Sequence, residues 1–186
     1  MKDQILAELR KVKRPGIESF INYLEKETDF FKAPASSEFH LAIPGGLAQH
    51  SWNVYQALNP IAKKYVPDVK EESIILSGLL HDLCKTNFYK NDFRNKKNDA
   101  GVWEKVPYYS IDDKDPFGHG EKSVILINRY MSLEKDEALA IRWHMGSWDA
   151  EGYMSRKCLN AALDKCKLLK ALMLADQLST FFMEDK

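Results

Sequence analysis

An apolar run that ends in two ionisable residues constrains this chain more than any other feature. The segment Ser73–Leu80 contains five Ile or Leu residues, and His81 and Asp82 follow it directly. Burying an ionisable group costs free energy unless the group is hydrogen-bonded, paired with an opposite charge or bound to a metal. A buried helix that ends in an imidazole and a carboxylate therefore predicts a partner for both side chains, and a metal site is the leading hypothesis.

Most of the sequence has the apolar spacing of amphipathic α-helices. We expect helices over residues 5–12, 17–24, 47–65, 69–83, 123–131, 133–145 and 160–182. Pro60 should kink or split the third of these helices, because proline lacks the backbone N–H that a helix needs. Residues 28–46 contain two prolines and two adjacent glycines, which is typical of a loop. The pattern predicts an all-α fold.

The segment 86–117 is the exception to the helical pattern. Its aromatic and β-branched residues lie on both sides of the turn-like sequence Asn98–Gly101, so we predict a small β-hairpin inserted between two helices. An insertion of this length is typical of a lid or a specificity element rather than of packing filler.

Charge and cysteine content limit the class of protein. Lys and Arg together number 27, as do Asp and Glu, so the formal net charge is zero. A balanced charge argues against strong general nucleic-acid binding and against an electrostatic membrane binder, but leaves room for a locally basic site. No apolar run is long enough to span a bilayer, and the N-terminus lacks the apolar stretch of a signal peptide. The three cysteines have no C-x-x-C spacing, which favours reduced thiols and a cytoplasmic protein.

Six ionisable residues lie in or beside apolar helical stretches, where a metal ion would satisfy them. They are His50, His81, Asp82, His119, His144 and Asp176. They are spread over about two-thirds of the chain, unlike the closely spaced ligands of a zinc finger, so spacing alone does not bring them together. His40, the fifth histidine, has no motif around it.

The order His, His-Asp, Asp resembles the signature of the HD superfamily of metal-dependent phosphohydrolases. The resemblance is carried by Gly46-Leu-Ala-Gln-His50, by Leu79-Leu-His-Asp-Leu-Cys-Lys85 and by Asp176. His119 and His144 resemble the two extra histidines of binuclear members such as the HD-GYP phosphodiesterases. The Gly-Gly-Leu-x-x-His start looks most like the HD module of certain bacterial 3′-to-5′ exoribonucleases. The chain has no Gly-Tyr-Pro element, which argues against cyclic-dinucleotide cleavage, and no room for an N-terminal OB-type domain.

The resemblance implies an all-α HD-domain helical bundle with the hairpin inserted in it. It implies a single HD-type domain over residues 1–186, with an HD core over about 44–182 and a helical N-terminal extension over 1–43. It also implies a reaction in which metal-activated water cleaves a phosphate mono- or diester, here of a nucleotide or oligonucleotide.

The same resemblance implies the site residues and the cofactors. His50, His81, Asp82 and Asp176 would hold a first divalent metal, and His119 and His144 would hold a second, with Asp82 bridging. A nitrogen-rich site with two carboxylates suits Fe, Mn, Co, Ni or Zn better than Mg. Asp82 and Lys85 are the expected catalytic residues, with Lys85 neutralising phosphate charge beside the metals.

Other interpretations remain open on the sequence alone. The protein could be a non-catalytic HD-fold module that binds a nucleotide or a partner, or a helical bundle with incidental histidines. His119 or His144 could lie at the surface or act as a general acid in a one-metal enzyme. Lys85 could simply offset a helix dipole. Cys84 is interpreted as packing, and packing is also favoured over base stacking for the four tryptophans.

Overall fold

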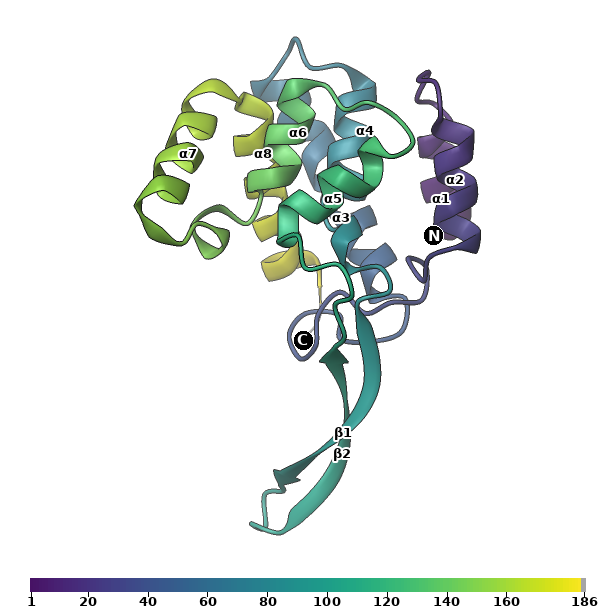
Figure 1. The fold of residues 1–186 in the computed structure, drawn as a ribbon, viewed down its shortest axis with the longest axis vertical. Helices are drawn as coiled ribbons and strands as arrows, with labels where there is room; N and C mark the ends of the chain where they lie inside the picture. Colours follow the sequence, from purple (N-terminus) through teal and green to yellow (C-terminus); the bar gives the residue numbers. More distant parts are fainter. Residues whose placement is uncertain (185–186) are drawn as a thin grey trace.

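Two buried helices, α3 (Gly46–Tyr65) and α4 (Glu71–Leu80), lie at the centre of the protein (Figure 1). The structure is a computed structural model, and it describes residues 1–184. All side chains of the run Ser73–Leu80 are buried, as expected for a helix that is apolar all round. Helix α3 packs against α4 on one side and against α8 (Lys167–Leu178) on another.

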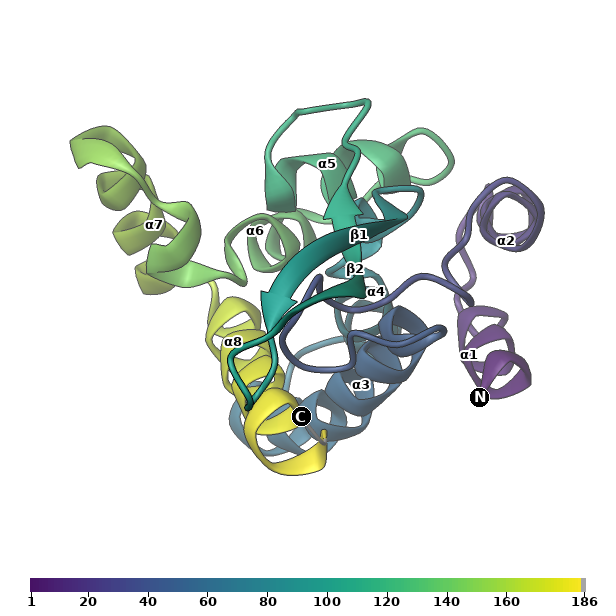
Figure 2. The same ribbon diagram turned by 90° about the horizontal axis from the view of Figure 1, so that it is seen from below.

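The remaining helices surround this centre. They are α1 (Lys2–Leu9), α2 (Ile17–Lys26), α5 (His119–Asn128), α6 (Lys135–Trp143) and α7 (Gly152–Lys165). Figure 2 shows α1 and α2 on one side of the central helices and α7 on the other. Short 3₁₀ turns occupy Leu83–Lys85 and Gly146–Asp149, and a π-helical turn, Ser179–Met183, follows α8. Apolar side chains from α1 to α8 form a continuous core.

Two glycines, Gly78 and Gly120, allow neighbouring helices to approach each other closely. A Cβ atom added at Gly78 on α4 would lie 2.8 Å from the Cα of Tyr55 on α3. A Cβ atom added at Gly120 on α5 would lie 2.2 Å from the carbonyl oxygen of Arg142 on α6. Contacts this short exclude any larger side chain unless the helices separate, so these glycines set the spacing of both helix pairs.

The predicted β-hairpin is confirmed. Strands β1 (Tyr89–Lys97) and β2 (Trp103–Ile111) pair antiparallel, with Tyr89 opposite Ile111 and Lys97 opposite Trp103. Gly101 in the connecting turn has a φ of 78°, a conformation that favours glycine. The hairpin projects as an arm away from the helices (Figure 1).

The sequence prediction was wrong about the last helix. The expected helix over 160–182 is two helices, α7 and α8, because Cys166 adopts an extended conformation between them. The Cys166 Sγ then accepts a hydrogen bond from the Leu169 N–H at the start of α8. Of the two effects expected of Pro60, a split is excluded, because α3 continues through Pro60 to Tyr65. Within residues 1–184, none of the helices combines the length and the apolar character needed to cross a bilayer.

An ion pair between the half-buried Arg14 and the fully buried Glu137 joins the N-terminal segment to the centre of the fold. The Arg14 guanidinium, between α1 and α2, donates two hydrogen bonds to the Glu137 carboxylate on α6, at 2.5 and 2.6 Å. Ser73 on α4 donates a third, at 2.6 Å. Burial alone would raise the pKa of Glu137, but these hydrogen bonds outweigh it and lower that pKa.

Replacing Glu137 with Ala should therefore lower the free energy of unfolding by about 3 kcal/mol at neutral pH, because it leaves the Arg14 charge without its main partner. The lowered pKa means that the pair stabilises the fold above the pKa of Glu in the unfolded chain, about 4.3. That stabilisation is lost as the pH falls through the folded-state pKa. Urea denaturation at pH 7 measures the effect.

Glu25→Ala is the matched control. Glu25 pairs with Lys2 at the surface, and such exposed pairs contribute about 0–1 kcal/mol. Equal destabilisation by the two substitutions would contradict the central role of the Arg14–Glu137 pair.

Candidate metal centre

The six residues predicted as ligands come together in the structure, although they lie on five separate elements. His50 is on α3, His81 ends α4 and is followed by Asp82, His119 begins α5, His144 ends α6, and Asp176 is on α8. The His50 Nε2 lies 3.2 Å from the His81 Nε2 and 3.2 Å from an Asp176 oxygen. Two overlapping groups of three, His50–His81–Asp176 and His81–Asp82–His144, have ligand atoms within 4.8 Å of one another, and His119 joins them through a third group with Asp82 and Cys84.

His81 and His144 have the same local geometry. Each follows the last residue of a helix, and each donates its Nδ1–H to the carbonyl oxygen three residues earlier, Gly78 at 3.0 Å and Ile141 at 2.7 Å. A carbonyl oxygen only accepts, so Nδ1 must carry the proton in both rings. In the neutral ring the lone pair is then on Nε2, which points toward the other site residues in both cases.

The two oxygens of Asp82 face two different groups. Oδ1 lies 2.8 Å from the His119 Nε2 and 3.4 Å from the His144 Nε2. Oδ2 lies 3.5 Å from the His50 Nε2 and 3.6 Å from the His81 Nε2. Asp82 is buried between these pairs, so its two oxygens face different pairs of imidazoles, and the two pairs adjoin at His81 and His144, whose ring centroids are 4.9 Å apart.

Burial and charge determine the protonation of these groups. Burial lowers the pKa of His81 to about 3, which keeps its imidazole neutral. Burial also disfavours the charged form of His50, but hydrogen bonds with Asp176 and Glu184 raise its pKa to about 9. Burial would raise the pKa of Asp82, yet the charge of Lys85 and the neighbouring imidazoles hold it well below its usual range.

Lys85 and Cys84 complete the surroundings of Asp82. The Lys85 Nζ lies 2.7 Å from the Asp82 Oδ2. Burial disfavours its charge, but Asp82 outweighs burial and raises the pKa of Lys85, so the ammonium group persists. Cys84 is buried with its Sγ 3.4 Å from the His119 Nδ1, and burial raises the pKa of its thiol to about 12. A buried neutral thiol agrees with the packing role expected for Cys84.

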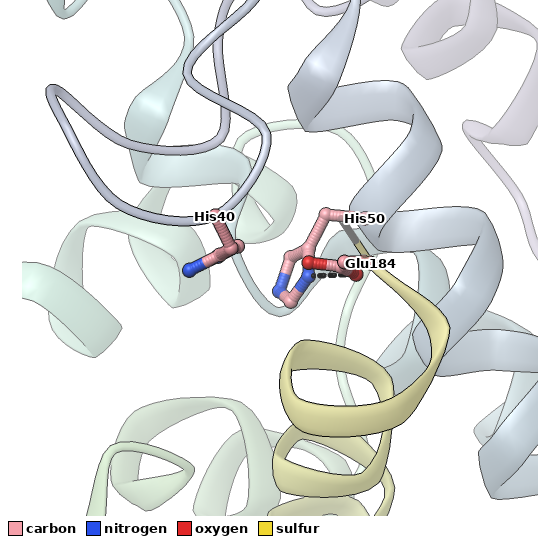
Figure 3. Close-up of side chains that lie close together, drawn as sticks. All are labelled: His40, His50 and Glu184. Atoms are coloured by element: carbon pink, nitrogen blue, oxygen red, sulfur yellow. Dashed lines mark hydrogen bonds and ion pairs between the residues drawn. The ribbon is translucent and has the colours of Figure 1, made fainter. Parts of the chain in front are cut away.

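The sequence analysis missed Glu184 and set aside His40, and both lie beside His50 (Figure 3). The Glu184 Oε1 accepts a hydrogen bond from the His50 Nδ1 at 2.9 Å, and Ser179 and Asn53 also donate to it. The ring centroid of His40 lies 4.9 Å from that of His50. Glu184 had no sequence signal, because only the turn after α8 brings it to α3.

The donor atoms fit a divalent cation. Within residues 1–184, the buried Nε2 of His144 has no hydrogen-bond partner. Burial disfavours a charged His144 ring, but the Asp82 carboxylate 3.4 Å away outweighs burial and raises the pKa of His144, so a positive charge, either a proton or a cation, is favoured between the two atoms. A cavity of about 270 Å³ opens beside these atoms, lined among others by His40, Lys85 and Asp176, so the site is accessible to a small ligand.

Comparison with known proteins agrees with this geometry. The family model described as HD domain matches residues 47–180, which is more than half of the chain. A search of curated proteins and a search of solved structures each found no match. The particular likenesses to exoribonuclease modules and to HD-GYP members remain predictions. The extent of the match and the sequence order of the clustered residues show that this chain belongs to the HD domain family.

Proposed function

We propose that this protein is a metal-dependent phosphohydrolase that cleaves a phosphate mono- or diester of a nucleotide or oligonucleotide. Membership of the HD domain family supports metal-dependent hydrolysis. The observation that carries the proposal is the buried Asp82 carboxylate, whose two oxygens face two different pairs of histidines. We also propose that residues 1–186 form one HD-type domain, because the core is continuous from α1 to α8.

In this proposal the ligands divide into two sets that share Asp82. His50, His81, Asp82 and Asp176 would hold one divalent cation, and His119 and His144, with Asp82, would hold another. Imidazole and carboxylate donors suit Fe, Mn, Co, Ni or Zn. Such cations, when bound, make a water molecule acidic enough to attack near neutral pH and neutralise charge on phosphoryl oxygens.

The protein's own groups position the substrate and the ligands. The carbonyl groups of Gly78 and Ile141 hold the His81 and His144 rings with Nε2 toward the site. Lys85 keeps its charge at the cavity wall, where an ammonium group favours the approach and orientation of a phosphate. Lys85 pairs with the Asp82 carboxylate, which the histidines also surround. The charge that would bind phosphate therefore lies beside the metal ligands.

The first prediction concerns metal content. Protein purified without chelator should contain a transition metal, and removing it with EDTA should lower Tm, because a ligand bound only by the folded state stabilises that state. His81→Ala and Asp82→Ala should lose metal and the hydrolysis of nitrophenyl phosphate esters. Asp176→Asn should also lower metal content and hydrolysis. Its control is Asp164→Asn, on the exposed surface of α7, which should retain the metal and the activity.

Two results would contradict the proposal in different ways. Absence of metal, together with no hydrolysis after adding Mn or Fe, would reject the metal-dependent enzyme. Bound metal and saturable nucleotide binding without turnover would instead favour the non-catalytic binding module.

The second prediction separates one metal from two. His119→Ala and His144→Ala should each lower the bound metal by about one ion per chain and leave the other in place, because His50, His81 and Asp176 remain. Elemental analysis of the folded variants, checked by circular dichroism, gives the count. An unchanged count would assign His119 and His144 to another role, such as proton donation to the leaving group.

The third prediction concerns Glu184. A carboxylate that accepts the second N–H of a ligating histidine orients the ring and makes it a better donor, and its loss weakens metal affinity about 10- to 100-fold. We expect Glu184→Ala to show this loss in a metal titration. Glu184→Gln should recover part of it, since the amide oxygen still accepts from His50. Equal metal affinity in wild type and Glu184→Ala would exclude the positioning role.

A further inference from the structure

The two faces of the hairpin differ in chemistry. Residues directly opposite in an antiparallel pair share a face, so the register assigns each side chain. One face, here called the aromatic face, carries Tyr89, Phe93, Trp103 and Tyr109 together with Lys97 and Lys105. The acidic residues of the two strands, Asp92 and Glu104, are both on the opposite face.

Large apolar groups on the aromatic face are exposed to solvent. Phe93 is 61% exposed, Trp103 65% and Ile111 62%. A two-stranded hairpin alone in water is marginally stable, and a contiguous exposed apolar surface marks an interaction site. Packing therefore does not explain Trp103, contrary to the expectation from sequence, and the arm projects away from the helices that could cover it (Figure 1).

The aromatic face begins at the candidate metal centre. Tyr89, at the base of the arm, lines a cavity of about 300 Å³ together with Lys85 and His119. Tyr89 and Tyr109 are neighbours, with ring centroids 6.3 Å apart. A ligand that lies along the aromatic face would therefore reach the residues that surround Asp82.

We propose that the aromatic face binds single-stranded nucleic acid and guides it toward the metal centre. This inference rests on the proposed function and names its substrate class. Exposed aromatic rings on which bases stack, interleaved with cations that track the backbone, are the features that bind single strands. The Lys97 Nζ lies over the ring of Trp103, 5.3 Å from its centroid, so a cation accompanies the most exposed ring of the aromatic face. Each strand of nine residues spans about 30 Å, enough for several nucleotides.

Charge favours a nucleic acid over a second copy of this chain. A second copy seated on the same surface would bring two lysine-bearing faces together, with no carboxylate from either face to pair with Lys97 and Lys105. A phosphate backbone supplies those negative charges. The zero net charge of the whole chain is compatible with this, because the acidic residues of the two strands, Asp92 and Glu104, lie on the other face.

The test measures binding and hydrolysis separately. The metal-loaded protein is titrated into a fluorescein-labelled phosphorothioate oligothymidylate of about twelve nucleotides, and anisotropy is recorded. Phe93→Ala and Trp103→Ala should each weaken binding about tenfold, because stacking on one ring contributes roughly that factor. Tyr153→Ala, which removes an exposed ring on α7, should leave affinity unchanged.

A charge-matched pair tests the choice of face. Lys105→Glu should weaken binding more than Lys90→Glu, because Lys90 lies on the opposite face and both variants change the net charge equally. Hydrolysis of bis(p-nitrophenyl) phosphate by all these variants should equal that of wild type, since the substitutions lie outside the metal centre.

Three results would overturn the inference. They are equal affinity in all variants, equally tight binding of a duplex of the same length, and a Trp103-dependent dimer that binds no oligonucleotide. If bis(p-nitrophenyl) phosphate is still hydrolysed in those cases, the proposed function survives and only the role of the arm is rejected. If the metal-loaded wild type hydrolyses neither p-nitrophenyl phosphate nor bis(p-nitrophenyl) phosphate, the proposed function is rejected instead.

Discussion

The burial of the Asp82 carboxylate among four imidazoles is the constraint on which the rest of the structure depends. A carboxylate removed from water needs compensating positive charge or donors, and the fold supplies them from every direction. Lys85 compensates one oxygen directly. The histidines come from helices far apart in sequence, so the central helices must hold a fixed spacing for their nitrogens to reach the same point.

Two glycines maintain that spacing. Gly78 lets α4 lie against α3, which places His81 beside His50. Gly120 lets α5 lie against α6, which places the rings of His119 and His144 5.1 Å apart between centroids. The packing of these helices therefore determines the geometry of the site. A small increase in side-chain volume at either glycine would move a pair of donor nitrogens.

The parts predicted from sequence are those with a local periodic signal. The apolar spacing identified most helices, and the aromatic residues around Asn98–Gly101 identified the hairpin. The six clustered residues were identified because ionisable groups in apolar stretches are unusual and because their order resembles the HD signature. The break at Cys166 was missed because neither glycine nor proline marks it.

Glu184 was missed for a different reason. It sits near the end of the chain with no apolar pattern around it, and its significance comes only from a contact with His50, 134 positions earlier. Long-range partners of this kind depend on how helices dock, which a single sequence does not contain. The division of the hairpin into two faces also needed the strand register. The net charge of the whole chain does not show how charge is distributed between the two faces.

The strict alternation along the arm has a consequence for how this protein can change during evolution. Inserting or deleting one residue within β1 would move each side chain beyond that point to the other face. An insertion before Asp92 would place the Asp92 carboxylate on the aromatic face and move the Phe93 ring to the opposite face. Length variation should be tolerated in the turn at Asn98–Gly101, which lies at the tip of the arm, and in two-residue steps within the strands. The register of this short hairpin thus restricts the sequence more tightly than its exposed position suggests.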